Sequence, residues 1–152
     1  MYTENRITIK GPAAKVYELA EDVMRWPEIL PHYRWVKLIR QEGDFRVVEM
    51  AARRNFIPVK WTSIQEPRPE QLRIIFRHIG GPTKGMYVEW DIWQEDTASG
   101  PVTQVKIWHE FSPDWPVIGP FAAKYIIGKF FVHYIAGKTL ACIKRIVEGG
   151  TV

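Results

Sequence analysis

Two kinds of residue pattern follow each other along this chain, and their order constrains its fold more than any other feature. Apolar and polar residues alternate in seven segments separated by turn residues, namely 6–10, 33–40, 45–53, 57–65, 72–78, 86–93 and 103–111. A period of two residues is typical of β-strands. Short connections such as Glu42-Gly43-Asp44 favour hairpins between neighbouring strands. The alternating segments therefore predict a seven-stranded antiparallel sheet.

Helical patterns follow the first alternating segment and return after the last one. Pro12 suits the first turn of a short helix over residues 13–21. A further helical turn is expected over residues 24–30, and Pro31 ends it. From Phe121 to Val147 apolar residues recur at the helical period on one arc.

The last of these helices is long enough to organise the whole fold. At 1.5 Å per residue it spans about 40 Å, so it can cross the sheet and bury one face on it. The order of strand, two short helices, six strands and long helix predicts an α+β fold, with a curved sheet wrapped around the C-terminal helix. A bent sheet cannot pack flush against one helix everywhere. We therefore expect an internal cavity between them.

Composition bounds the remaining possibilities. The chain has 152 residues, of which 46% are hydrophobic and 25% charged, which is typical of a folded globular protein and predicts one domain over residues 1–152. Cys142 is the one cysteine, so no internal disulfide can form, which suits a reducing compartment. Residues 1–10 show no signal-peptide pattern, and charges interrupt the most apolar stretch, 125–142. We expect a cytoplasmic protein without a transmembrane segment.

Several chemistries look absent from the sequence. The four histidines show no metal-ligand spacing among themselves or with Cys142, and we expect no metal and no cofactor. The Gly80–Lys84 segment lacks the P-loop pattern and is interpreted as a turn. The net charge of +4 is modest, and Arg53-Arg54 is its densest basic spot, so nucleic-acid binding is not expected.

Local stretches of the sequence resemble a known superfamily over nearly the whole chain. They are the segment VYELAEDVMRWPEILPHYRWV over residues 16–36, Trp61-Thr62-Ser63, the Gly-rich turn before residues 86–90, and His109-Glu110-Phe111. In this order they resemble the START/Bet v1-like (SRPBCC) superfamily, in its branch of polyketide cyclase/dehydrase-like and coenzyme-Q-binding START-like proteins. The resemblance implies a helix-grip fold that holds a hydrophobic small molecule between sheet and helix.

The chain is similar, within that branch, to bacterial aromatase/cyclases of polyketide pathways. Trp26 and Tyr33 match a Trp and a Tyr that such enzymes carry near the pocket mouth. Those enzymes also carry Trp-x-Ser-x-Arg on a cavity-facing strand, with the arginine proposed to bind and polarise the polyketide. Here the segment is Trp61-Thr62-Ser63-Ile64-Gln65, so an uncharged amide replaces that guanidinium.

The resemblance also implies which strand faces look inward. It places Trp61, Ser63 and Gln65 on one inward row, and His78 and His109 on two others. His109 is the best candidate for acid–base work, since the pKa of a histidine can be tuned across neutral pH, although an inward histidine is more often a structural hydrogen-bonding group. His78 is interpreted as structural because it lies beside a turn. The predicted catalytic residues are Tyr33, Ser63, Gln65 and His109. The alternative for Tyr33 is that it seals the pocket mouth, and the alternative for Ser63 is a hydrogen bond to nearby backbone or water.

Seven Trp residues are many for a chain of this length, and their rings could either fill the core or line an apolar ligand pocket. The cavity is predicted between the sheet face with Trp61 and Trp90 and the helix arc with Val132, Ala136 and Thr139. The predicted ligand-binding residues are Trp26, Trp61, Phe76, Val88, Trp90, Ile107, Tyr125, Val132 and Ala136.

Three functions follow, from different classes. The leading hypothesis is a binding protein for a lipid, quinone or polyketide-like ring compound. The second is a polyketide aromatase/cyclase or dehydratase that uses the same cavity. The third is a lipid-transfer or membrane-docking module, which would use the aromatic pair Phe130-Phe131 with Lys124, Lys129 and Lys138 for peripheral membrane contact. The sequence leaves the ligand and the oligomeric state open.

Overall fold

The sheet of this protein bends around one end of a helix, and this bend shapes its interior. The computed structural model describes residues 2–111 and 131–149. In this part of the chain seven strands form one antiparallel sheet in the order β1-β7-β6-β5-β4-β3-β2. The strands are β1 (Tyr2–Lys10), β2 (Tyr33–Glu42), β3 (Phe45–Arg54), β4 (Ile57–Arg68), β5 (Arg73–Gly80), β6 (Tyr87–Thr97) and β7 (Gly100–Glu110). The predicted seven-stranded antiparallel sheet is confirmed.

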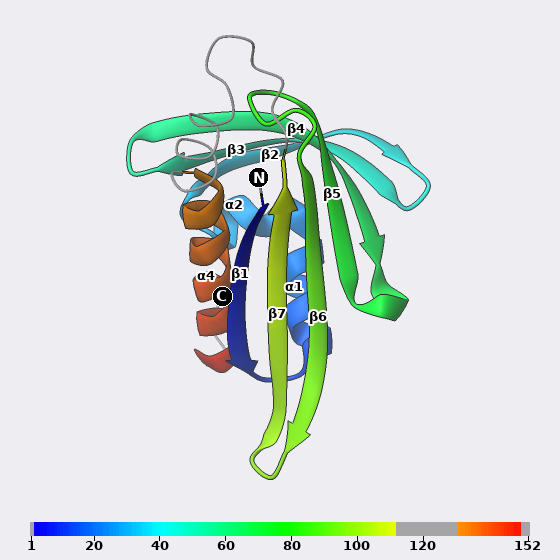
Figure 1. Ribbon diagram of the computed structural model, residues 1–152, viewed down its shortest axis with the longest axis vertical. Helices are drawn as coiled ribbons and strands as arrows, with labels where there is room; N and C mark the ends of the chain where they lie inside the picture. The colour runs from blue at the N-terminus through cyan, green and yellow to red at the C-terminus, as the bar shows by residue number, and fades with distance from the viewer. Residues whose placement is uncertain (1, 112–130, 150–152) are drawn as a thin grey trace.

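The helices lie on the concave side of the sheet. Between β1 and β2 come α1 (Ala13–Glu21), a 3-10 turn η1 (Val23–Arg25) and α2 (Trp26–Ile29), and a second 3-10 turn η2 (Pro69–Gln71) joins β4 to β5. The C-terminal helix α4 (His133–Gly149) packs against β1. Figure 1 shows β1, β7 and β6 running beside α4, while β2, β3 and β4 cross beyond its first turn. This is the predicted helix-grip arrangement.

One strand ends later than the sequence predicts, and one predicted helix boundary cannot be compared with the structure. The sequence predicts a strand over residues 57–65, yet β4 continues to Arg68, with Pro67 opposite Ile74 of β5. The pairing of β4 with β3 already ends at Gln65, so the missing N–H of Pro67 lies where the strand has a neighbour on one side only. The predicted helix start at Phe121 lies outside the described residues.

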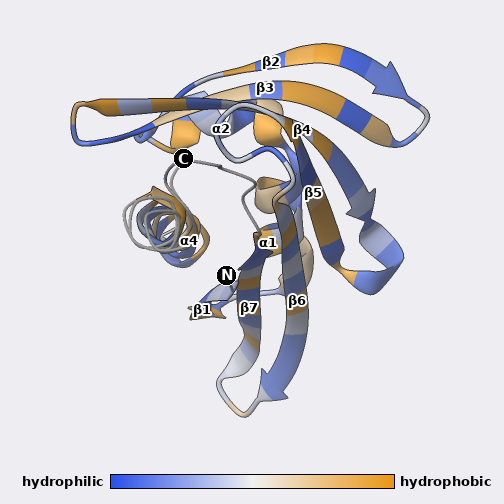
Figure 2. Ribbon diagram, turned by 45° about the horizontal axis from the view of Figure 1, so that its top comes forward, coloured by the Kyte–Doolittle hydropathy of each residue, from blue (hydrophilic) through white to orange (hydrophobic). Residues whose placement is uncertain are grey.

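A core of buried side chains fills the space between the sheet and α4. It includes Ile9 of β1, Val16 of α1, Val105 of β7 and Ile143 of α4, which are all buried. Figure 2, seen along α4, shows apolar bands alternating with polar ones along β2 to β5 around the helix. The alternation expected from the sequence thus points one row of each strand toward α4. This arrangement positions the candidate site at the His133 end of the helix.

Candidate functional site

A cavity lies between the first turns of α4 and the sheet face opposite them. Its volume is about 80 Å³, and its lining is mostly apolar. Ten of the predicted site residues line it, namely Trp26, Tyr33, Trp61, Phe76, Val88, Trp90, Ile107, His109, Val132 and Ala136. Eight further lining residues were not among those predicted to bind a ligand or catalyse: Met50, Val59, His78, Thr83, Met86, Phe131, Ile135 and Thr139. The predicted residue Tyr125 lies outside the described residues.

Aromatic rings form one wall of this cavity. The ring of Trp26 meets Tyr33 edge-on with centroids 5.0 Å apart, and it lies 6.0 Å from Trp90 and 6.2 Å from Phe76. Tyr33 in turn meets the edge of Trp61 at 6.1 Å. Rigid rings in edge-to-face and tilted contact stabilise one another but fill space incompletely. The wall therefore offers flat apolar surface to an occupant.

Two histidines with different surroundings face the same cavity. The ring of His78 stacks on Trp61, with centroids 5.7 Å apart and planes 4° from parallel. Its Nδ1 lies 2.6 Å from the hydroxyl Oγ1 of Thr83. The Nδ1 of His109 lies 3.4 Å from Oγ1 of Thr3 on the neighbouring strand β1. Each imidazole is thus held by one hydroxyl on one side.

Burial sets the chemistry that these imidazoles can perform. It lowers the pKa of His78 to about 3, and it lowers that of His109 to about 3 with a smaller contribution from the nearby histidines His78 and His133. Both rings are therefore neutral at pH 7, and each can donate one hydrogen bond and accept another. Since a general base works best with a pKa near the operating pH, these rings suit hydrogen bonding to a neutral ligand better than proton abstraction.

Tyr33 lies among the aromatic rings of the cavity wall. Burial raises the pKa of its phenol well above the usual range, so it stays protonated at every physiological pH. Its ring contacts Trp26, Trp61 and the imidazole of His32 at 5.0 Å. These contacts favour the role of sealing the cavity, which was the alternative to proton donation.

Ser63 and Gln65 face inward, but they do not line the cavity. The hydroxyl of Ser63 donates to the Arg77 carbonyl at 3.3 Å. The amide of Gln65 donates to the Glu21 carbonyl at 2.8 Å and accepts from Arg46 at 3.3 Å. Arg46 also pairs with the Glu21 carboxylate at 2.7 Å. Gln65 therefore joins β4 to the end of α1, and its hydrogen-bonding capacity is used there.

The described residues were compared with the requirements of a metal site and of a membrane-spanning helix. In residues 2–111 and 131–149 no group of three or more His, Cys, Asp or Glu side chains could hold a metal ion. None of the helices within those residues combines the length and the apolar character that a bilayer-spanning helix needs. Of the residues proposed for peripheral membrane contact, Phe131 lines the cavity and Lys138 lies on α4, whereas Lys124, Lys129 and Phe130 lie outside the described residues.

Comparison with known proteins gives one family and one fold. A model of the family described as polyketide cyclase / dehydrase and lipid transport matches residues 9–126. A relative named as a putative polyketide cyclase of Streptomyces cyaneus is 30% identical over 122 residues, which cover 76% of this chain and 77% of the relative.

Two solved structures share the fold. The crystal structure of the Zhui aromatase/cyclase from Streptomyces sp. R1128 superposes with a TM-score of 0.82 at 21% identity, over 100% of this chain and 99% of that one. A START superfamily protein from Mycobacterium smegmatis superposes with a TM-score of 0.64 at 15% identity, over 99% and 96% of the two chains. At these identities the likeness extends to the fold alone.

Proposed function

The chain belongs to the polyketide cyclase/dehydrase and lipid transport family, and we propose that it binds a hydrophobic ring compound of the polyketide type in the cavity beside α4. One observation carries this proposal: rings from α2, β2, β4, β5 and β6 and two neutral histidines converge on a single cavity. Flat apolar walls suit a ring system, and neutral imidazoles suit the carbonyl and hydroxyl groups around its edge.

The size of the cavity adds a condition to the proposal. A volume of about 80 Å³ is smaller than the roughly 300–1,000 Å³ of typical ligand pockets. A bicyclic ligand therefore enters only when lining side chains move. Met50 and Met86 line the cavity, and their unbranched side chains can take other rotamers at small cost. We expect binding to be accompanied by rearrangement of these methionines.

A calorimetric titration with a dihydroxynaphthalene tests the proposal. Trp61→Ala should weaken binding by at least about tenfold, because it removes one apolar wall and the ring on which His78 stacks. Trp93→Ala is the matched control, since Trp93 is a partly exposed residue of β6 outside the lining. Equal affinities of the two variants, or no saturable binding to the unchanged protein, would refute the proposal.

The names of the relatives favour a second function, in which the bound compound is also cyclised or dehydrated. His78 and His109 would then hold carbonyl and enol groups of a poly-β-ketone in position for ring closure. We do not extend this role to Ser63 and Gln65, because both are hydrogen-bonded outside the cavity lining.

Product analysis with a poly-β-ketone surrogate separates catalysis from binding. If the protein is a cyclase, His109→Asn should change the ratio of cyclised products, whereas Gln65→Ala should leave that ratio unchanged in the folded fraction. A product distribution identical to that of the surrogate in buffer would show that this protein binds without catalysing cyclisation.

A further inference from the structure

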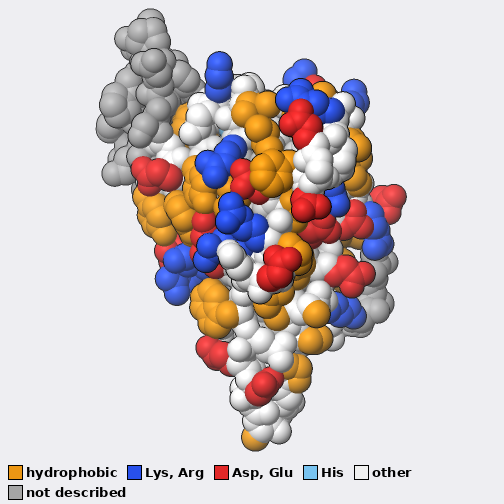
Figure 3. All heavy atoms as spheres, turned by 90° about the vertical axis from the view of Figure 1, so that its right-hand side faces the viewer, with side chains coloured by type: hydrophobic (Ala, Val, Ile, Leu, Met, Phe, Trp, Pro, Cys, Tyr) orange, Lys and Arg blue, Asp and Glu red, His pale blue; other side chains and the backbone are white. Residues whose placement is uncertain are grey.

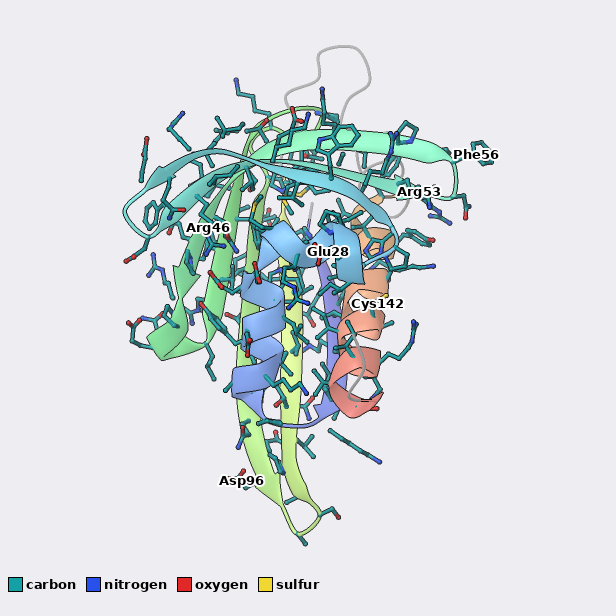
Figure 4. The ribbon with its side chains drawn as sticks, turned by 180° about the vertical axis from the view of Figure 1, so that it is seen from behind. Glu28, Arg46, Arg53, Phe56, Asp96 and Cys142 are labelled. Carbon is teal, nitrogen blue, oxygen red and sulfur yellow. The ribbon has the colours of Figure 1, made fainter. Side chains whose placement is uncertain are left out.

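A second hollow lies on the other side of the His133 end of α4, outside the aromatic cavity. Its volume is about 280 Å³, and it is lined by Pro31, His32, Arg53, Asn55, Tyr134 and Lys138. The hollow shares no described lining residue with the aromatic cavity. Figure 4 shows Arg53 in β3, close to the hairpin whose tip carries Phe56. Three segments far apart in sequence thus meet at this place.

The charges of this hollow are not neutralised by the described residues. The guanidinium of Arg53 makes no ion pair or side-chain hydrogen bond with them, and the ammonium of Lys138 contacts only the ring of Tyr134, at 5.7 Å. No described carboxylate lines the hollow. Arginines elsewhere differ: Arg73 pairs with Asp91 at 3.1 Å and Arg77 with Glu66 at 2.9 Å. Figure 3 shows acidic and basic side chains intermingled on the face toward β5 and β6.

His32 adds a buried acceptor without a partner to this site. Its side chain is 4% exposed, and its Nε2 lies 2.8 Å from the hydroxyl of Thr139. That hydroxyl donates its proton to the Ile135 carbonyl at 2.8 Å, so Nε2 must carry the hydrogen of this bond.

The tautomer follows from this network. Nδ1 of His32 is therefore an unprotonated acceptor, which is covered from solvent and has no hydrogen-bond partner among the described residues. The burial of the ring and the charge of Lys138 lower the pKa of His32 to about 4, which agrees with a neutral ring. A buried acceptor of this kind gains from an occupant that donates a hydrogen bond.

The geometry points to a binding site for a phosphoryl group in this hollow. Arg53 and Lys138 would hold the negatively charged oxygens. A protonated oxygen of the same group would donate to Nδ1 of His32 once the side chains that cover this buried atom have moved aside. The second pKa of a phosphate monoester is about 6, so near that pH the group carries both a negative charge and a protonated oxygen. A carboxylic acid has a pKa of about 4, so it has lost its proton at neutral pH and cannot donate to Nδ1 of His32. A carboxylate therefore fits this site less well than a phosphoryl group.

A titration with inorganic phosphate at pH 6 tests the site. The ring nitrogens of isotope-labelled His32 should shift saturably, and Nδ1 should shift most. Arg53→Gln and Lys138→Gln should each weaken phosphate binding by at least about tenfold, since each removes a charge-assisted hydrogen bond. The matched control is Arg145→Gln, at an exposed residue of α4 outside the hollow, which should bind phosphate like the unchanged protein.

The proposal is wrong if phosphate produces no saturable shift of His32, or if all three variants bind phosphate equally well. The site does not depend on the ring-binding function proposed above, because Arg53 and Lys138 do not line the aromatic cavity. A failure to bind dihydroxynaphthalene would therefore leave the phosphate result unaffected, and the converse also holds.

Flotation with lipid vesicles identifies the source of the phosphoryl group. Phe56 is 89% exposed at the hairpin tip beside the hollow. If the group belongs to a lipid, the protein should bind vesicles containing phosphatidic acid but not pure phosphatidylcholine, and both Arg53→Gln and Phe56→Ser should reduce this binding. Phosphate binding without vesicle binding assigns the site to a soluble phosphorylated compound. Vesicle binding that is unaffected by Arg53→Gln, with no phosphate binding, would overturn the site.

Discussion

The two ends of α4 are buried against the same sheet, but with different kinds of side chain. At the Gly149 end, aliphatic residues such as Ile9, Val105 and Ile143 interdigitate. A methyl group added at Gly11 would lie 2.5 Å from Cγ1 of Val147, so this end has no spare room. At the His133 end, rigid rings and two histidines surround a cavity of about 80 Å³. The difference shows that the shape of the side chains decides whether the space between helix and sheet is tightly packed or contains a cavity.

The two ends also treat buried polar groups differently. At the packed end the hydroxyl of Thr103, which is fully buried, donates to the Gly11 carbonyl at 2.7 Å. At the cavity end His78 and His109 each meet one hydroxyl and turn toward the open space. Polar groups are thus satisfied internally where the fold needs rigidity, and they remain available where a ligand can reach them.

The largest effect should come from adding the same side-chain atoms at each end. Ala20 of α1 and Ala136 of α4 are both buried helical alanines, but only Ala136 lines the cavity. Ala20→Leu should lower the free energy of unfolding by about 1–3 kcal/mol through overpacking. Ala136→Leu should cost clearly less, because its added atoms enter the cavity. Urea denaturation of both variants measures the difference.

Ligand binding provides the second readout of this pair. Ala136→Leu should abolish binding of dihydroxynaphthalene, whereas the folded fraction of Ala20→Leu should bind it normally. Equal destabilisation by the two substitutions would mean that the cavity end is as tightly packed as the other, and the comparison would fail.

Lowering the pH should reduce the free energy of unfolding through the buried histidines at the cavity end. Burial keeps the pKa of His109 at about 3, against about 6.5 in an unfolded chain, so between these values the unfolded state binds the additional proton. Stability is therefore full above about pH 6.5 and falls as the pH decreases, by about 1 kcal/mol per pH unit for each such histidine. His109→Asn should reduce the slope of unfolding free energy against pH between 6 and 4 by that amount.

The control for this pH effect is His133→Asn. His133 is exposed at the start of α4, and its charge makes only a smaller contribution to the lowered pKa of His109, so this substitution should leave most of the slope in place. Carboxylates contribute equally to the slope in both variants and cancel in the comparison. If the two variants show the same slope, His109 is not held in its neutral form by burial.

Much of this arrangement was predictable from local patterns, because strand alternation reports directly which face is buried. The inward position of Trp61, Trp90 and His109 followed from that alternation together with the family resemblance. The partners of Gln65 did not follow, since the Glu21 carbonyl reaches it only through the placement of α1 across the sheet. Local sequence carries no record of such long-range contacts.

His78 shows a second limit of the sequence pattern. Its position beside a turn suggested a structural residue at the rim of the sheet. In the structure the turn folds back, so that Thr83 meets Nδ1 of His78 and the N–H of Gly85 donates to the His78 carbonyl at 2.9 Å. The turn thereby encloses the ring and directs it toward the cavity. The alternation that pairs Phe76 with His78 on one face was the available signal, and it was outweighed by proximity to the turn.

The smallest effect should appear when one buried threonine hydroxyl is removed from each end. Thr103→Val deletes the donor to the Gly11 carbonyl where no water can enter, so it should lower the free energy of unfolding by about 1 kcal/mol. Thr83→Val deletes the hydroxyl on His78, but the adjoining cavity has room for water, which needs roughly 10–15 Å³ per molecule. A water molecule can take over the lost hydrogen bond, so the cost should be about half as large.

Urea denaturation measures both costs, and nitrogen chemical shifts of His78 should show a water-bonded but still neutral ring in Thr83→Val. A larger loss of stability for Thr83→Val than for Thr103→Val would mean that water does not reach His78, and the cavity would then be closed to polar groups of a ligand as well.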